Sequence, residues 1–378
     1  MHSDCRPPQG GRFSFAYDEV RVDMSRLPGT ERSVDICYGG WRALQIAVAS
    51  LAVLTLTFSG CQTGGNTSAA KPEQAAHRDE RNAPSAGWPR TFPNAHGPDV
   101  VLEKPALNII SLQPNVAEMV VAIGGHSSLL AVDRYTAYPP EAASKPKIGD
   151  ILSPDYEKIV SMQPDLIITS RGTPEDVLSK LRDLGFQVLG VDPEGLDDVF
   201  SCMKMFGRII GIETVAADVT AQLQRRREAV MTQVAEAVAG HGQPRTLFVL
   251  AMEPLFIAGP SSFIASMIEE AGGRQAYQAT QGFANQPWPQ VSKETVLAVA
   301  PDVLIFSVGQ TDADTSESTA NCLAQLRKDA AWAQVPAVKE GRVYVMDEDL
   351  ITIPGPRLVE GLEQMAEFLH PSSATEPQ

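Results

Sequence analysis

The chain has few cysteines, five among 378 residues. If the apolar run near the N-terminus is part of a processed leader, only Cys61, Cys202 and Cys322 remain. Cys202 and Cys322 lie in different segments, so a bridge between them is possible, but the spacing indicates no disulfide framework. A small domain held together by disulfides is therefore excluded, and a hydrophobic core must stabilise the fold.

Positive charge is also scarce. Lys and Arg together number 31 against 46 Asp and Glu, which gives a formal net charge of -15 and a pI near 4.9. A nucleic-acid-binding surface needs a basic face that displaces counterions from phosphates. The balance therefore argues against a nucleic-acid partner and leaves a small ligand open.

Short catalytic motifs are missing from the sequence. It contains no GxxxxGK[ST] phosphate loop, no GxGxxG after the first predicted strand, no GxSxG elbow and no HExxH. The histidines do not cluster with metal-ligand spacing, so no metal site is predicted. Two other classes of protein remain as alternatives: an enzyme with a two-lobed fold tethered to a membrane, and a structural or adhesive lipoprotein. No residue pattern supports either.

One long apolar run, ALQIAVASLAVLTLTF, follows Arg42. It is short for a membrane-spanning helix and is typical of a signal-peptide core. The sequence Phe58-Ser59-Gly60-Cys61 then resembles a lipoprotein processing site, although Phe58 stands where Leu is usual. We expect residues 1–61 to form a leader and Cys61 to be lipidated, which would tether the protein to a membrane of the cell envelope. An uncleaved signal anchor is the alternative.

Residues 62–105 are rich in Gly, Ala, Pro, Ser, Asn and charge and contain few large aliphatic residues. Such a segment buries too little apolar surface to order itself, so it is predicted to be a flexible tether. Residues 371–378 are predicted to be a short tail. The stretch between them is long enough for two domains, each with its own core.

A repeat is the most informative feature of that stretch. EKIVSMQPDLII, which begins at Glu157, and ETVLAVAPDVLI, which begins at Glu294, share a Glu, a helical apolar pattern and a Pro-Asp that leads into a β-rich run. Ser153 and Pro154 are expected to open the first helix. The spacing is too wide for a solenoid, so the repeat predicts two α/β lobes built on one plan.

Strand and helix patterns alternate on both sides of a purely helical segment. We therefore predict an N-terminal lobe over residues 106–195, a helical spine over 196–241 and a C-terminal lobe over 242–370, each lobe with a central parallel sheet. One helix from Glu213 to about Ala239 would span roughly 37 Å and could run along both lobes. A cleft between the lobes follows from this arrangement.

Several ordered motifs carry a family resemblance: IISLQPNVAE, YTAYPPEA, EKIVSMQPDLIITSRG, QPWPQVSKETVLAVAPD and GPRL. Together they resemble the helical-backbone class of periplasmic binding proteins for ABC importers, especially the cobalamin-binding members, over almost all of residues 107–369. The resemblance implies two Rossmann-like α/β lobes, one long connecting helix, a largely preformed cleft and delivery of a small molecule to a membrane permease. We expect the protein to act as a monomer without a cofactor.

The repeated glutamates have two explanations. Glu157 and Glu294 each lie in the first turn of a predicted helix, where the helix dipole favours a carboxylate. In the family, the matching glutamates form salt bridges with permease arginines, so the resemblance implies a docking role for both. By contrast, Asp165 and Asp302 follow a proline at a helix-to-strand junction and are expected to be structural.

The resemblance also implies ligand contacts. Tyr135, Phe256 and Trp288 align with aromatic positions that line the cobalamin cleft, and Asp349 aligns with a further cleft residue that could accept hydrogen bonds from corrin amides. From the residues alone, the aromatics could equally anchor loops to the core, and Asp349 could be a solvated strand end.

Other cleft positions depart from the cobalamin-binding pattern. Ile151 and Ser170 stand where cleft tryptophans are usual, and Ile353 replaces an arginine; Ser170 is retained as a ligand-site position. The family disulfide is missing, with Ala271 and Met365 at its two ends. A corrinoid is therefore the first expectation for the ligand, and haem or an iron-siderophore complex is the alternative, with Tyr135 as the candidate iron ligand for haem.

Overall fold

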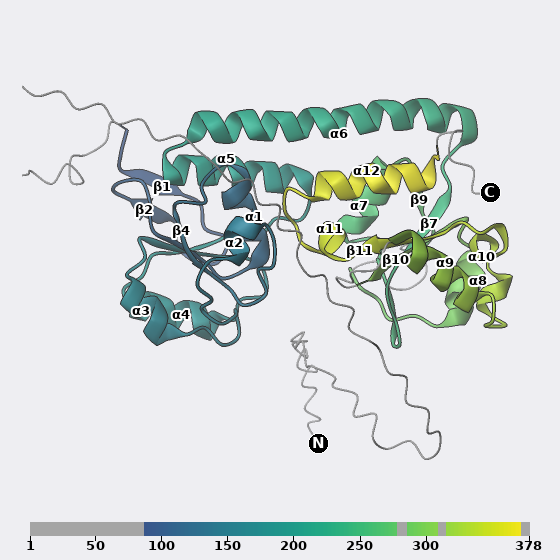
Figure 1. Cartoon of the computed structure of the whole chain (residues 1–378), viewed down its shortest axis with the longest axis horizontal. Coiled ribbons are helices and arrows are strands. Elements are labelled where there is room, and N and C mark those ends of the chain that lie inside the picture. The colour runs from purple at the N-terminus through teal and green to yellow at the C-terminus, as the bar shows by residue number, and fades with distance from the viewer. Residues whose placement is uncertain (1–86, 278–285, 309–314, 372–378) are drawn as a thin grey trace, which may run out of the picture. The chain divides into compact units, whose positions relative to one another are not determined.

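The computed structural model describes residues 87–277, 286–308 and 315–371 (Figure 1). The chain divides into two units, Met1–Ala76 and His77–Gln378, and the described residues all belong to the second. The expected leader, its lipidation site at Cys61, the first part of the expected tether and nearly all of the expected tail lie outside the described residues.

The N-terminal lobe is built on a four-stranded parallel sheet. Its strands lie in the order β4-β3-β5-β6, with β3 in register with β5 from Ile109↔Leu166 onward. The strands are β3 (Ile109–Ser111), β4 (Leu129–Val132), β5 (Leu166–Thr169) and β6 (Val188–Gly190). The connecting helices are α1 (Pro114–Ala122), α2 (Pro140–Ala143), α3 (Tyr156–Met162) and α4 (Glu175–Asp183).

The segment just before this lobe differs from the prediction. Residues 87–105, expected to be the end of a flexible tether, contain β1 (Arg90–Phe92) and β2 (Val100–Leu102), which pair antiparallel. Phe92 is fully buried and joins the main hydrophobic core. The few large side chains of this segment alternate between core and solvent, and that spacing was hidden by the surrounding polar composition.

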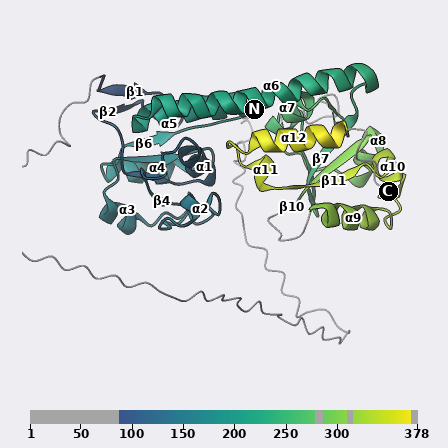
Figure 2. The same ribbon diagram turned by 45° about the horizontal axis from the view of Figure 1, so that its top comes forward.

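Two helices form the spine, as predicted. α5 (Leu196–Ile210) ends at Gly211, and α6 (Glu213–His241) continues for 29 residues along both lobes (Figures 1 and 2). The two helices pack closely at Gly207, where a Cβ would lie 2.3 Å from the Cβ of Ala216, so only glycine permits this contact. The core beneath α6 is continuous, because residues of both lobes and the spine belong to one buried cluster.

The C-terminal lobe has a mixed five-stranded sheet. β7, β9, β10 and β11 pair in parallel, which confirms the predicted central parallel sheet, and β8 adds an antiparallel strand beside β7. The strands are β7 (Arg245–Met252), β8 (Leu255–Ile257), β9 (Arg274–Gln275), β10 (Val303–Val308) and β11 (Val343–Asp347). The helices are α7 (Phe263–Glu270), α8 (Lys293–Val299), α9 (Thr315–Leu326), η4 (Trp332–Gln334), α10 (Pro336–Glu340), α11 (Asp349–Thr352) and α12 (Leu358–Leu369).

The sequence repeat is also a structural repeat. α3 and α8 are each seven residues long and end in a left-handed residue, Gln163 with φ 49° and Ala300 with φ 44°. A proline and an aspartate follow, and then a buried strand, β5 or β10. The N-cap of α3 is Asp155, which accepts a hydrogen bond from the backbone of Lys158, and not Ser153 as expected.

The two repeated aspartates hold each repeat to the first strand of its lobe. The carboxylate of Asp165 accepts hydrogen bonds from the backbone N–H groups of Leu107 and Asn108 at 3.0 and 2.9 Å. The carboxylate of Asp302 accepts one from the backbone N–H of Arg245 at 2.9 Å and binds its guanidinium at 3.0 Å. Both have structural roles, as predicted.

Candidate functional site

Tyr135 lies on the loop after β4 and is 61 % exposed. The buried carboxylate of Asp133 shapes this loop, because it accepts hydrogen bonds from the backbone N–H of Tyr135 at 2.7 Å and from the hydroxyl of Thr136. Burial raises the pKa of Asp133, and its hydrogen bonds and the charge of Lys147 oppose the shift. The Tyr135 ring is thus held outward by a buried polar anchor.

Phe256 and Trp288 lie on adjacent segments. Residues 287–291 run beside β8, with the N–H of Ile257 donating to the carbonyl of Pro289 and the N–H of Gly259 to that of Pro287. A Cβ on Gly259 would lie 2.1 Å from the Gln286 carbonyl oxygen, so glycine is required for this approach. Both aromatic side chains are half-buried.

The ring of Trp288 is supported from one side. It meets Phe263 of α7 edge-on, with ring centroids 6.0 Å apart and planes at 85°. The rest of the ring is partly exposed, which is the arrangement of an aromatic that is fixed by the core and still has surface to offer a ligand.

Ser170, expected at the ligand site, is buried. It is 2 % exposed, and its hydroxyl accepts a hydrogen bond from the side chain of Asn115 at 3.1 Å. Its carbonyl accepts from the side chains of Gln113 and Thr173. The side chain therefore supports the end of β5 and offers almost no surface to a ligand.

Asp349 begins α11 and belongs to a charged group that joins the lobes. Its carboxylate lies 3.7 Å from the guanidinium of Arg357, which also forms a two-pronged pair with Glu118 of α1 at 3.0 and 2.7 Å. The Arg357 guanidinium lies 4.4 Å from the ring centroid of Tyr138. We call Glu118, Tyr138, Asp349 and Arg357 the interlobe clasp.

Burial dominates the electrostatics of the clasp. The side chain of Glu118 is 3 % exposed and that of Arg357 13 %. Desolvation raises the pKa of the Glu118 carboxyl, whereas the hydrogen bonds and charge of Arg357 oppose that shift. The pair is therefore a buried ion pair. Removing one partner alone strongly destabilises the folded state, because the other charge is then buried without its partner.

A pocket of about 300 Å³ adjoins the clasp. Its walls come from α1, the Tyr138–Pro139 loop, α6 and the start of α12. The clasp residues Glu118, Tyr138 and Arg357 line it, together with Val121, Ala122, Pro139, Leu223, Arg226, Pro356 and Glu360. It thus contains residues of both lobes and the spine, but none of the five predicted ligand residues lines it.

A profile described as "Periplasmic binding protein" matches residues 109–350, which is more than half of the chain. This chain belongs to the periplasmic binding protein family. As a member, it is an extracytoplasmic substrate-binding protein of ABC transport and not an enzyme.

Two solved relatives of this binding protein share its fold and bind different ligands. It is 27 % identical to YvrC of Bacillus subtilis, an uncharacterized ABC transporter substrate-binding lipoprotein, over 89 % of this chain and 98 % of the relative. The vitamin B12-binding protein BtuF of Vibrio cholerae has a solved structure that is 27 % identical, with a TM-score of 0.59 over 70 % of this chain and 97 % of that one. The haem-binding protein BhuT, solved with two haems, is 26 % identical, with a TM-score of 0.60 and coverage of 70 % and 97 %. The predicted fold of two α/β lobes and one long helix is confirmed.

The two predicted docking residues of this binding protein are both exposed. Glu157 lies in the first turn of α3 and Glu294 in the first turn of α8. A hydrogen bond from the Ser292 hydroxyl, the backbone N–H of Glu294 and the nearby charge of Lys293 lower the pKa of Glu294. Exposure of both residues is compatible with docking, which stays a prediction.

Sequence reasoning missed the clasp. Glu118, Tyr138 and Arg357 each lie within a motif that carries the family resemblance, namely IISLQPNVAE, YTAYPPEA and GPRL. The signal was a charged residue inside an apolar helix pattern, with Glu118 flanked by Ala117 and Met119, because such a residue needs a partner when buried. Its partner is 239 positions away, so the pairing appears only in the fold.

Three further observations complete the description. Among the described residues, no group of three or more His, Cys, Asp or Glu side chains is placed to hold a metal ion. Within the same ranges, no helix combines the length and apolar character needed to cross a membrane. Cys202 and Cys322 are both free thiols.

Proposed function

We propose that this binding protein captures a corrinoid in a cleft between its lobes and delivers it to an ABC permease. The observation that carries the proposal is the pair of half-buried aromatics, Phe256 and Trp288, on adjacent segments of the C-terminal lobe, with exposed Tyr135 on a loop of the N-terminal lobe. Large flat ligands with apolar faces bind well to such fixed aromatic surfaces.

The polar part of the proposed site comes from Asp349. Its carboxylate could accept hydrogen bonds from the amide side chains at a corrin rim, and the guanidinium of Arg357 lies 3.7 Å from it. Ser170 takes part only through its support of the β5 end, because its side chain is buried.

Haem or an iron-siderophore complex is the second candidate. Tyr135 favours haem, because a phenolate is an established haem-iron ligand and this ring is largely exposed. The TM-score with the haem-binding structure, 0.60, is nearly equal to that with the B12-binding structure, 0.59, and this supports the alternative.

Delivery is proposed to depend on Glu157 and Glu294, with the protein held at the membrane as a monomer through lipid on Cys61. One carboxylate on each lobe would meet cationic side chains of the permease, and such pairs set register and encounter rate. Lipid attachment at the start of a tether would keep the folded lobes close to the transporter.

Uptake by cells that lack the endogenous protein tests the proposal. Cells supplied with the full chain should take up radiolabelled cyanocobalamin, whereas the double variant Glu157→Lys/Glu294→Lys should lose most of this uptake and still bind the ligand. Hemin uptake measured in the same cells tests the alternative. Cyanocobalamin uptake that does not depend on the chain would contradict the corrinoid proposal.

A further inference from the structure

The two repeat helices expose the same pair of side chains. In α3, Glu157 is followed three residues later by Val160, and in α8, Glu294 is followed three residues later by Leu297. Val160 is 45 % exposed and Leu297 is 38 % exposed. Residues three apart lie on one face of a helix, so each lobe presents a carboxylate beside an aliphatic side chain.

Shared helix register produces this exposure in both lobes. Ile159 and Val296, one position before each aliphatic, are both buried against the lobe. Ser161 and Ala298, one position after it, are both exposed. Single exposed aliphatic residues are common on protein surfaces. Here the exposed aliphatic recurs at the equivalent position of each repeat and beside the same acidic residue.

Neighbouring cations are engaged elsewhere. The ammonium group of Lys158 donates to the carbonyl of Lys147 at 2.7 Å, and that of Lys293 pairs with Asp329 at 2.6 Å. Within the described ranges, neither Glu157 nor Glu294 takes part in an ion pair. Within these ranges, each carboxylate is therefore available to pair with a cation of an external partner.

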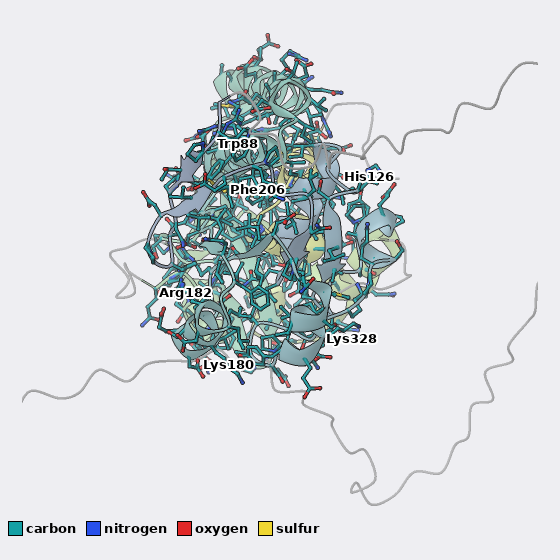
Figure 3. The ribbon with its side chains drawn as sticks, turned by 90° about the vertical axis from the view of Figure 1, so that its left-hand side faces the viewer. Trp88, His126, Lys180, Arg182, Phe206 and Lys328 are labelled. Carbon is teal, nitrogen blue, oxygen red and sulfur yellow. The ribbon has the colours of Figure 1, made fainter. Side chains whose placement is uncertain are left out.

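α3 lies at the edge of the N-terminal lobe opposite α6 (Figure 1). Lys180 shows this, because its ammonium lies 3.9 Å from the ring centroid of Tyr156 and it appears at the edge opposite α6 in Figure 3. α8 packs into a different core cluster from α6, since Val296 belongs to one cluster and Val230 of α6 to another. The acidic and aliphatic pairs are thus separate from the spine, which already packs against both lobes.

We propose that Val160 and Leu297 are apolar anchors of the permease interface, an inference that rests on the proposed docking role of Glu157 and Glu294. The partner would offer each lobe a basic side chain next to an apolar recess. Because the pair occurs twice in one chain, the partner would offer that surface twice, as two equivalent membrane subunits do. Charge guides the encounter, and burial of the aliphatic side chains slows dissociation.

Photo-crosslinking in the native host identifies the partner. Benzoylphenylalanine is placed singly at positions 157, 160, 294 and 297 of the full chain, and at Val215 of α6, which is 49 % exposed, as the control. We expect products with an ABC importer membrane subunit, identified by mass spectrometry, from the four helix positions and none from position 215. If none of the four positions gives such a product, the proposed docking function itself fails.

Binding to the crosslinked importer, purified in nanodiscs, then tests the anchors. The double variant Val160→Ser/Leu297→Ser should bind at least about tenfold more weakly, which corresponds to about 1.4 kcal/mol, with an unchanged dependence on salt. Glu157→Gln/Glu294→Gln should instead weaken the salt dependence. The swapped variant Val160→Leu/Leu297→Val should retain affinity within about threefold.

Folding is monitored separately by thermal unfolding of each variant, with Val215→Ser as a matched exposed substitution. If the glutamate variants lose affinity while Val160→Ser/Leu297→Ser binds like the wild type, the anchor inference is wrong and the docking proposal stands. Loss of affinity in both sets, with wild-type folding and wild-type binding by Val215→Ser, supports the inference.

Discussion

Equivalent polar residues of the two repeats have different partners, and their partners determine their pKa and their contribution to stability. Asp302 and Asp165 occupy equivalent positions of the repeat, yet only Asp302 binds an arginine, Arg245. Burial alone would raise the pKa of Asp302, but the hydrogen bonds and charge of Arg245 outweigh it and hold the pKa below its usual value. The carboxylate of Asp302 therefore stabilises the folded state in its ionised form.

The sign of the pH dependence follows. Because the folded pKa is lowered, the contribution of Asp302 is fully present above its unfolded value of about 3.9 and is lost as pH falls through the folded pKa. Asp302→Asn should lower the free energy of unfolding by about 1–2 kcal/mol at pH 7 and by less as the pH falls below 4. Urea unfolding between pH 2.5 and 7 measures this.

Asp165→Asn is the matched control, because it alters the same turn without an arginine partner. It should cost less than Asp302→Asn at pH 7. A cost for Asp302→Asn that stays constant or grows toward pH 3 would contradict the assignment.

The role of a single residue could be predicted from sequence where it depends on neighbouring residues in the chain. The structural roles of Asp165 and Asp302 follow from a Pro-Asp at a helix-to-strand junction, and both bind the neighbouring strand. The burial of Ser170 could not be anticipated, because the buried partner of its hydroxyl, Asn115, is 55 positions away.

At the scale of elements, the repeat helices show how a short motif ends a helix in two places. Gln163 and Ala300 both have positive φ without being glycine. A left-handed conformation brings Cβ close to the following carbonyl oxygen, which costs roughly 1–2 kcal/mol for an ordinary residue. Glycine avoids this contact but loses more backbone entropy on folding.

Gln163→Gly and Ala300→Gly should each raise the free energy of unfolding by about 0.5–1 kcal/mol. Ala298→Gly is the control, since Ala298 lies inside α8 with ordinary helical geometry and should lower stability by a similar amount. Urea unfolding at fixed pH measures both. If Ala300→Gly lowers the free energy of unfolding as much as Ala298→Gly does, the prediction that glycine stabilises this left-handed position is wrong.

Elements with strong periodicity were predictable, and short strands in polar surroundings were not. The long helix was expected from Glu213 to about Ala239 and runs to His241. The β1–β2 pair was missed because three-residue strands give too little alternation to stand out. Their fold depends on tertiary contacts such as the ion pair of Arg90 with Glu213 at the start of α6.

At the scale of the whole molecule, the lobes are joined by more than the spine. Arg227 of α6 pairs with Asp197 of α5 at 2.6 Å and with Glu270 of α7 at 2.7 Å. The clasp adds a direct contact between the lobes, from Arg357 to Glu118. Together these contacts favour a nearly rigid arrangement with limited closure.

The clasp can be tested against the more exposed ion pair of Arg226, another residue that lines the pocket, with Glu363. Glu118→Ala removes the carboxylate that is hydrogen-bonded to the buried Arg357 guanidinium, so it should lower the free energy of unfolding by about 2–4 kcal/mol. Glu363→Ala removes the exposed partner of Arg226 and should cost less than about 1 kcal/mol. Equal small losses in urea unfolding would contradict a coupling role for the clasp.

Ligand capture is the central claim, and titration of the purified full chain tests it most directly. Cyanocobalamin, cobinamide, hemin and a ferric siderophore are added separately, while the visible spectrum and tryptophan fluorescence are recorded. The account predicts saturation by a corrinoid at one molecule per chain, with at least about tenfold weaker binding by Trp288→Ala. Saturation by hemin alone, or corrinoid binding that is unchanged in Trp288→Ala, would contradict it.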